Sequence, residues 1–195
     1  MGIHVAPAKL HWNYFLALER DMESAARYIE FSQQNFSTFS IELAHLLFAA
    51  ASEVDVVAKL LCKQVAPDKP CRNINEYRGI LLQHIPELPR SKVFVPRYGL
   101  DFEPWVNWED GRNPLWWKAY NDVKHHRDEH FQDATLKNAL NALGALLLLA
   151  VYYYAEVLKI PPQGPLLLRD TTALLLPASS LLRLDAEHYR AAQPY

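Results

Sequence analysis

One segment of the chain concentrates side chains that are able to take part in chemistry: residues 113–127 read NPLWWKAYNDVKHHR. In a helix, Asn121 and His125 lie four residues apart and therefore on one face. Neutral histidine both donates and accepts hydrogen bonds and titrates near physiological pH, so His125 suits proton transfer. The amide of Asn121 could orient the imidazole or bind a hydroxyl group.

The neighbouring row of the same helix adds positive charge. Tyr120 and Lys124 are four residues apart, and Arg127 follows three residues after Lys124. Either cation could hold a phosphate or stabilise a negative charge that develops during a reaction. The combination predicts nucleotide binding or metal-independent cleavage of a phosphodiester, with His125, Asn121, Lys124 and Arg127 as the candidate catalytic residues.

Residues 121–125, which follow an aromatic-rich helix start, resemble the motif helix of the HEPN superfamily. The signature of that family is an Arg followed, after four to six residues, by a His, commonly with Asn, Asp or His directly after the Arg. In this chain the part from the polar residue to His125 matches. Residues 118–120 fill the three places where the Arg could fall, and none of them is Arg; Tyr120 stands at the commonest place.

The resemblance implies an α-helical domain that binds RNA or nucleotides, or that acts as a ribonuclease in toxin–antitoxin and antiviral defence systems. It also implies a homodimer, because two motif helices meet across a twofold axis in that family, and an antitoxin-like protein partner. In that family the charge and the hydrogen-bond donors of the Arg would polarise the scissile phosphate. Because this Arg is missing here, ribonuclease activity is not the only expectation. The alternatives are therefore a non-catalytic helical module that acts in protein–protein interaction, and an unrelated bundle with a small-molecule pocket.

An earlier segment offers a second part of the resemblance. Asp55 and Lys59 are four residues apart, like the acid-x-x-x-Lys pattern that HEPN domains often carry on the helix beside the motif. The resemblance implies that Asp55, Lys59 and Tyr120 support the site. The alternative is an ordinary helical ion pair in the favourable acid-first order.

Neither a metal nor a cofactor is predicted. His125, His130 and the acids Asp128 and Glu129 offer ligand atoms, but their spacing does not define a metal site. The chain has six glycines and lacks a phosphate-cradling glycine loop and a dinucleotide-binding fingerprint. Enzyme classes that depend on such loops are therefore poorly supported.

Composition indicates a globular protein of a reducing compartment. The chain has 195 residues, 50% of them hydrophobic, two cysteines and a net charge of −2. Because no signal peptide is visible, we expect a cytoplasmic protein. Eight Lys and Arg against three acids make residues 59–98 basic, which indicates either solvated loops and helix ends or a phosphate-contacting face. The uncharged run Ala142–Ala155 is shorter than the roughly 20 residues of a membrane span, so it predicts a buried helix and no membrane association.

The spacing of apolar residues predicts an all-α fold, a four- to five-helix bundle in a single domain, 1–195, like a HEPN domain. The helices are expected over about 8–31, 39–65, 74–85, 114–128 and 134–159. A β-hairpin or irregular structure is expected near 90–110 and 166–184, and the tail, 161–195, is expected to pack on the bundle.

Polar residues mark the expected helix starts. Ser37, Thr38 or Ser40 is expected to cap the second helix, Asn113 the fourth and Asp133 the last. Pro114 is expected at the first helical position of the fourth helix. In the first helix, Glu19 is expected on the polar face, away from the core.

Overall fold

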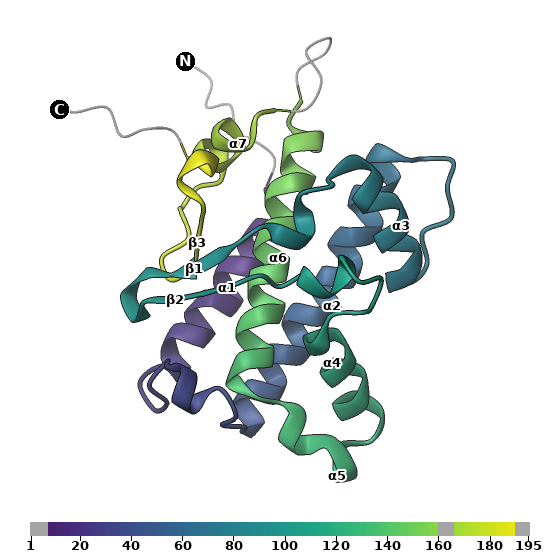
Figure 1. Ribbon diagram of the computed structural model, residues 1–195. Helices are drawn as coiled ribbons and strands as arrows, with labels where there is room; N and C mark the ends of the chain where they lie inside the picture. Colours follow the sequence, from purple (N-terminus) through teal and green to yellow (C-terminus); the bar gives the residue numbers. More distant parts are fainter. Residues whose placement is uncertain (1–7, 160–165, 190–195) are drawn as a thin grey trace, which may run out of the picture.

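The computed structural model describes residues 8–159 and 166–189 of the chain and is mostly helical (Figure 1). The expected positions 161–165 and 190–195 of the tail lie outside the described residues. The α-helices are α1 Leu10–Ala25, α2 Ile41–Val65, α3 Ile74–His84, α4 Leu115–His125, α5 Arg127–His130, α6 Leu136–Val157 and α7 Leu168–Leu174. The strands are β1 Val93–Val95, β2 Leu100–Phe102 and β3 Arg183–Leu184.

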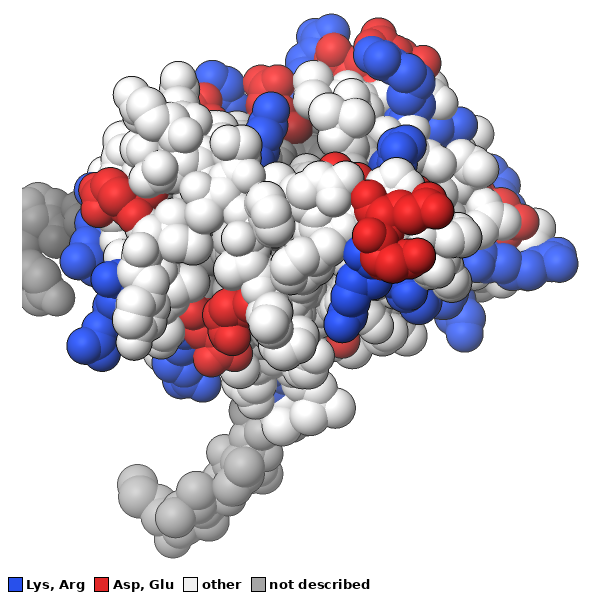
Figure 2. All heavy atoms as spheres, turned by 90° about the horizontal axis from the view of Figure 1, so that it is seen from below, with Lys and Arg blue, Asp and Glu red and all other residues white. Residues whose placement is uncertain are grey.

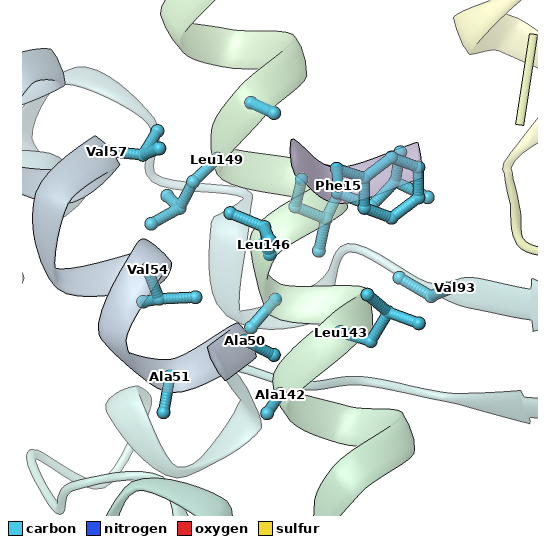
Figure 3. Packing of buried hydrophobic residues seen from close by; sticks show 14 of the residues in the cluster. Phe15, Ala50, Ala51, Val54, Val57, Val93, Ala142, Leu143, Leu146 and Leu149 are labelled. Atoms are coloured by element: carbon cyan, nitrogen blue, oxygen red, sulfur yellow. The ribbon is translucent and has the colours of Figure 1, made fainter. Parts of the chain in front are cut away.

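Helix α6 runs through the centre of the molecule, with α1 and α2 alongside it (Figure 1). Alanines and valines of α2 face alanines and leucines of α6, so the two backbones approach closely (Figure 3). Each fully buried leucine contributes roughly 1.5–3 kcal/mol. By length and composition α6 could cross a membrane, but 78% of its most apolar window is buried inside the protein. The predicted buried helix at Ala142–Ala155 is therefore confirmed.

A small antiparallel sheet crosses over α6 in the order β2-β1-β3 (Figure 1). The hairpin expected near 90–110 is confirmed as β1–β2, in which Val93 pairs with Phe102. Gly99, with φ of 62°, occupies the left-handed conformation that the turn between these strands requires. The tail provides β3, where Leu184 pairs with Val93. The fold is thus mainly helical, as predicted, with a third strand that comes from the far end of the chain.

The tail is attached by a buried carboxylate, which corrects the prediction that Glu19 lies on the polar face of the first helix. Glu19 is only 1% exposed. Its two oxygens accept hydrogen bonds from the backbone N–H groups of Ser180 at 2.9 Å, Leu181 at 3.1 Å and Leu182 at 3.0 Å. The Ser179 hydroxyl also donates to Glu19 and lies inside the protein. An acid is accepted there because the tail's own backbone donors surround it.

Two predicted helices have different bounds in the structure. The first ends at Ala25 rather than near 31, because the chain turns there and brings Phe31 into the core at 1% exposure. The fourth, expected over 114–128, is divided into α4 and α5. The break lies at His126, whose φ of −140° and ψ of 54° are not helical. The helices expected over 39–65 and 74–85 match α2 and α3 within two residues.

The caps differ in part from those predicted. Ser40, one of the three predicted candidates, caps α2: its hydroxyl oxygen accepts a hydrogen bond from the N–H of Leu43 at 3.1 Å. The first N–H of α4 donates to the side chain of Asn107, so neither Asn113 as a cap nor Pro114 as the first helical residue is correct. The cap of α6 is Thr135 rather than Asp133.

Candidate functional site

Helix α4 is fixed by its apolar face. Trp116, Ala119, Tyr120 and Val123 are buried at the spacing of one helical stripe. The indole N–H of Trp116 donates to the backbone carbonyl of Pro104 at 2.8 Å, so this large side chain has its polar atom satisfied in the core. Lys118, Lys124 and His125, outside this stripe, are consequently exposed to solvent.

A row of aromatic rings leads from the core to the face where α2 and α4 meet. The ring centroids lie 5.8 Å apart for Trp116 and Trp117, 5.6 Å for Trp117 and Tyr120, and 6.0 Å for Tyr120 and Phe48. Phe48 and Trp117 are partly exposed. The distances fall in the range of favourable edge-to-face and offset contacts, so the rings hold one another in place.

Two cations lie over the exposed end of this row. The Lys124 ammonium is 5.2 Å from the centroid of the Tyr120 ring, and it donates to the Tyr120 hydroxyl at 3.2 Å. The Arg127 guanidinium is 5.4 Å from the centroid of the Phe48 ring. Both lie within the distance of a cation–π contact, and both side chains are exposed. Arg127 reaches Phe48 from α5, so the prediction that it extends the row of Tyr120 and Lys124 along one helix is wrong.

His125 and Asn121 have different environments. His125 is the last residue of α4 and is exposed, and within the described part of the chain its imidazole has no hydrogen-bond partner. Asn121 is partly buried, and its amide donates to the backbone carbonyl of Trp117 in the preceding turn at 2.8 Å. The imidazole is thus free to meet a ligand, whereas one amide hydrogen of Asn121 is engaged within the helix.

Asp55 and Lys59 form the ion pair that their spacing predicts, but they belong to a different network. The Tyr77 hydroxyl of α3 donates to the second oxygen of Asp55 at 2.7 Å. Burial, together with this hydrogen bond to a carboxylate, raises the pKa of the Tyr77 hydroxyl. Asp55 follows Phe48 by seven residues, or about 10 Å along the axis of α2. The pair therefore stabilises the contact between α2 and α3, and within the described residues its hydrogen bonds do not reach the end of α4.

The break at His126 folds the chain back, so that Asp122, His130 and Asp133 offer ligand atoms within 4.8 Å of one another. These residues could hold a divalent cation, and they differ from the combination of residues 125, 128, 129 and 130 considered from the sequence. Each already has a partner: Lys118 pairs with Asp122 at 2.6 Å, and His130 contacts Asp133 at 3.0 Å. The hydrogen bond from Lys118 lowers the pKa of the Asp122 carboxyl. The side chains of this arrangement are therefore already engaged with one another and with Lys118.

Five of the eight cations in residues 59–98 have polar partners within the protein. Lys59, Arg90 and Lys92 are paired with carboxylates. Lys69 donates to Gln83, and Arg78 donates to the carbonyl of Gly111. Seen from the end where α5 lies, the surface carries small acidic and basic groups next to each other, separated by uncharged areas (Figure 2). An anionic ligand on this side would therefore be bound by a few neighbouring cations and not by an extended basic surface.

Phe48 is the site residue that the sequence interpretation missed. Its place on one face of α2 could have been predicted from the sequence, because Ala44, Phe48, Ala51 and Asp55 recur at helical intervals of four, three and four residues. Comparisons of the chain with protein-family models, with curated proteins and with solved structures found no match. The resemblance to the HEPN superfamily therefore stays a prediction from the sequence.

Proposed function

We propose that this protein is a HEPN-like RNA-binding protein. Its proposed contact surface consists of Phe48, Trp117, Tyr120, Lys124 and Arg127, and we name it the aromatic–cationic face. The observation that carries the proposal is that two exposed cations are held over two aromatic rings next to a histidine that has no partner among the described residues.

Single-stranded RNA presents the two chemical features that this face would complement. Unstacked bases stack on aromatic rings and on Arg guanidinium planes, with roughly 1–3 kcal/mol per base. The Arg127 guanidinium, 5.4 Å from the centroid of the Phe48 ring, would offer a further surface for such a stack. Lys124 and Arg127 would neutralise phosphates on either side of the base. A double helix would not fit this mode, because its bases are stacked on one another.

Binding, rather than cleavage, is the activity that we propose for the single chain. The position for the motif Arg holds Tyr120, which carries no charge. Asn121 already donates to the backbone of its own helix. Asp55 and Lys59 lie further along α2, where Asp55 accepts a hydrogen bond from Tyr77 of α3. Cleavage would then depend on His125 and on a second copy of α4 in a homodimer. A protein partner of antitoxin type would cover the same face.

RNA binding can be measured by fluorescence anisotropy with a labelled oligouridylate at several salt concentrations. Replacing Lys124 or Arg127 by Gln should weaken binding and reduce the magnitude of the salt slope by about 0.7 each, the value for one phosphate contact on a single strand. Phe48→Leu keeps an apolar side chain and removes the ring, so it should weaken binding by roughly 1–3 kcal/mol with the salt slope unchanged. Lys63→Gln, on the exposed last turn of α2, is the matched charge control.

The outcomes separate the candidate functions. RNA binding that is lost in the Arg127 and Phe48 variants but retained in the Lys63 variant supports the proposal. If the wild-type protein does not retain RNA, or if all variants bind equally, RNA binding at this face is wrong and the interaction module is favoured. Loss of RNA cleavage in His125→Ala, with binding retained, would add ribonuclease activity to the proposal.

A further inference from the structure

A histidine and a glutamate that are far apart in the sequence form a dyad between α1 and α2. The Nδ1 atom of His11 lies 2.6 Å from a carboxylate oxygen of Glu53, and the two side chains are only 18% and 14% exposed. Because Nδ1 is engaged by the carboxylate, the ring orientation is fixed and Nε2 is the nitrogen left for another partner. Among the described residues, no hydrogen bond to Nε2 is formed.

His11 of this dyad lines a cavity of about 320 Å³ between the start of α1 and the end of α6. The cavity is at the small end of the range for small-molecule sites. Its lining includes Lys9, His11, Tyr153, Tyr154, Val157 and Leu158. The His11 ring meets the Tyr153 ring edge to face, with centroids 5.4 Å apart, and Tyr153 meets Tyr154 in the same way at 5.1 Å. The cavity therefore has an ordered aromatic wall with one polar corner.

The polar corner favours a negative charge. The residues that line the cavity include Lys9 and His11 but no Asp or Glu. Glu53 contacts His11 but is not part of the lining, so the ammonium of Lys9 has no acid beside it in the lining. The cavity adjoins both the first turn of α1 and the last turn of α6, whose dipoles oppose each other, so the side chains decide the sign of the potential. The apolar wall and rim include Val157 and Leu10, which are 42% and 70% exposed.

We propose that this cavity binds a small aromatic monocarboxylate. The ring of the ligand packs against Tyr153, Tyr154 and the aliphatic rim, where it removes exposed apolar surface from water. Its carboxylate lies near the ammonium of Lys9 and accepts a charge-assisted hydrogen bond from Nε2–H of His11. This bond requires the doubly protonated imidazolium, because Nδ1–H already donates to Glu53. The carboxylate of Glu53 acts through His11 as a positioning residue. This site is separate from the aromatic–cationic face and does not depend on the proposed RNA binding.

Phenylacetate is a suitable probe, with phenylacetamide as its uncharged counterpart. Titrations of the full chain would be followed by long-range proton–nitrogen NMR of the histidine rings. The Nε2 signal of His11 should shift in a saturable way with phenylacetate, whereas His45, exposed on α2, should not respond. His11→Gln should weaken binding about tenfold or more, as expected for the loss of a charge-assisted hydrogen bond. Phenylacetamide should bind at least about tenfold more weakly for the same reason.

Two further variants keep the test independent of folding defects. Glu53→Gln retains a hydrogen-bond acceptor and should weaken binding while changing the chemical shifts of both His11 nitrogens in the free protein. Lys9→Gln changes a residue at the helix start and should also weaken phenylacetate binding, without an effect on phenylacetamide. His45→Gln should behave like the wild type. A wild-type protein whose His11 signal does not respond to phenylacetate, or variants at positions 9 and 11 that bind it equally well, would overturn the proposal.

Discussion

Glu19 should be among the most costly residues to replace outside the hydrophobic core. Its carboxylate is 1% exposed and accepts the N–H groups of Ser180, Leu181 and Leu182 at 2.9–3.1 Å. A hydrogen bond to a charged group contributes roughly 1.5–3 kcal/mol, and such contributions do not add when they share one acceptor. Glu19→Ala removes the shared acceptor and leaves these buried donors unsatisfied, at a cost of about 1–3 kcal/mol for each group. Because these costs do not add for donors that share one acceptor, we expect Glu19→Ala to lower the free energy of unfolding by about 3–5 kcal/mol.

Glu19→Gln should lie between this variant and the wild type, at about 2 kcal/mol, because its amide keeps one acceptor oxygen but turns an NH₂ group toward backbone donors. Urea denaturation measures both values, and the melting temperature of Glu19→Ala should fall by roughly 6–20 °C for a chain of this length. The amides of Leu181 and Leu182 should lose their protection from hydrogen exchange first, since they lose their acceptor directly.

Glu23 provides the matched control for this prediction. It lies one helical turn after Glu19 and accepts an exposed hydrogen bond from the Ser180 hydroxyl at 2.9 Å. Glu23→Ala should cost less than about 1 kcal/mol, as expected for an exposed contact. If the Glu19 and Glu23 variants were equally stable, the buried carboxylate would not be what attaches the tail.

Two other predictions concern packing and pH. A Cβ atom at Gly144 would lie 2.7 Å from the ring of Phe102 and 3.3 Å from Pro104. Gly144→Ala should therefore destabilise the protein by roughly 1–3 kcal/mol in urea denaturation, despite the higher helix propensity of alanine. A stabilised variant would contradict the close contact of α6 with the hairpin. The pKa of Asp122 is lowered in the folded state by Lys118, so the stabilisation from this pair is present above the unfolded pKa of the carboxyl and is lost as the pH falls through the lowered folded value. The stability difference between the wild type and Asp122→Asn should accordingly shrink between pH 7 and pH 3, and an unchanged difference would contradict the pairing.

Much of the helical fold was predictable because it follows from spacing and from local starts and stops. Helices α2 and α6 pack their apolar faces against each other, and the helical spacing of these apolar residues predicted both helices and their approximate bounds. Contacts between distant positions were not predictable. Glu19 lies at the helical spacing of the buried residues Phe15 and Met22, but an acid is not expected in a core without a partner. Its partners, the N–H groups of residues 180–182, lie about 160 positions away and could not be identified from the sequence.

The candidate site was predictable to the same extent. The aromatic and cationic residues of α4 are together, as their spacing predicts, because they occupy one helix. The break at His126 was not predicted, and because of it Arg127 lies on α5, where its guanidinium contacts Phe48. The pair formed by His11 and Glu53 was missed, because 42 residues separate them and no local pattern links them.

Cross-linking tests the aromatic–cationic face most directly. Ultraviolet irradiation of the protein with an oligouridylate, followed by mass spectrometry of the digested complex, identifies the residues in contact with bases. The account predicts cross-links in α4 at Trp117 or Tyr120 and in α2 at Phe48, and their loss in Arg127→Gln. Cross-links that fall elsewhere on the chain, or that persist unchanged in the Arg127 variant, would contradict it.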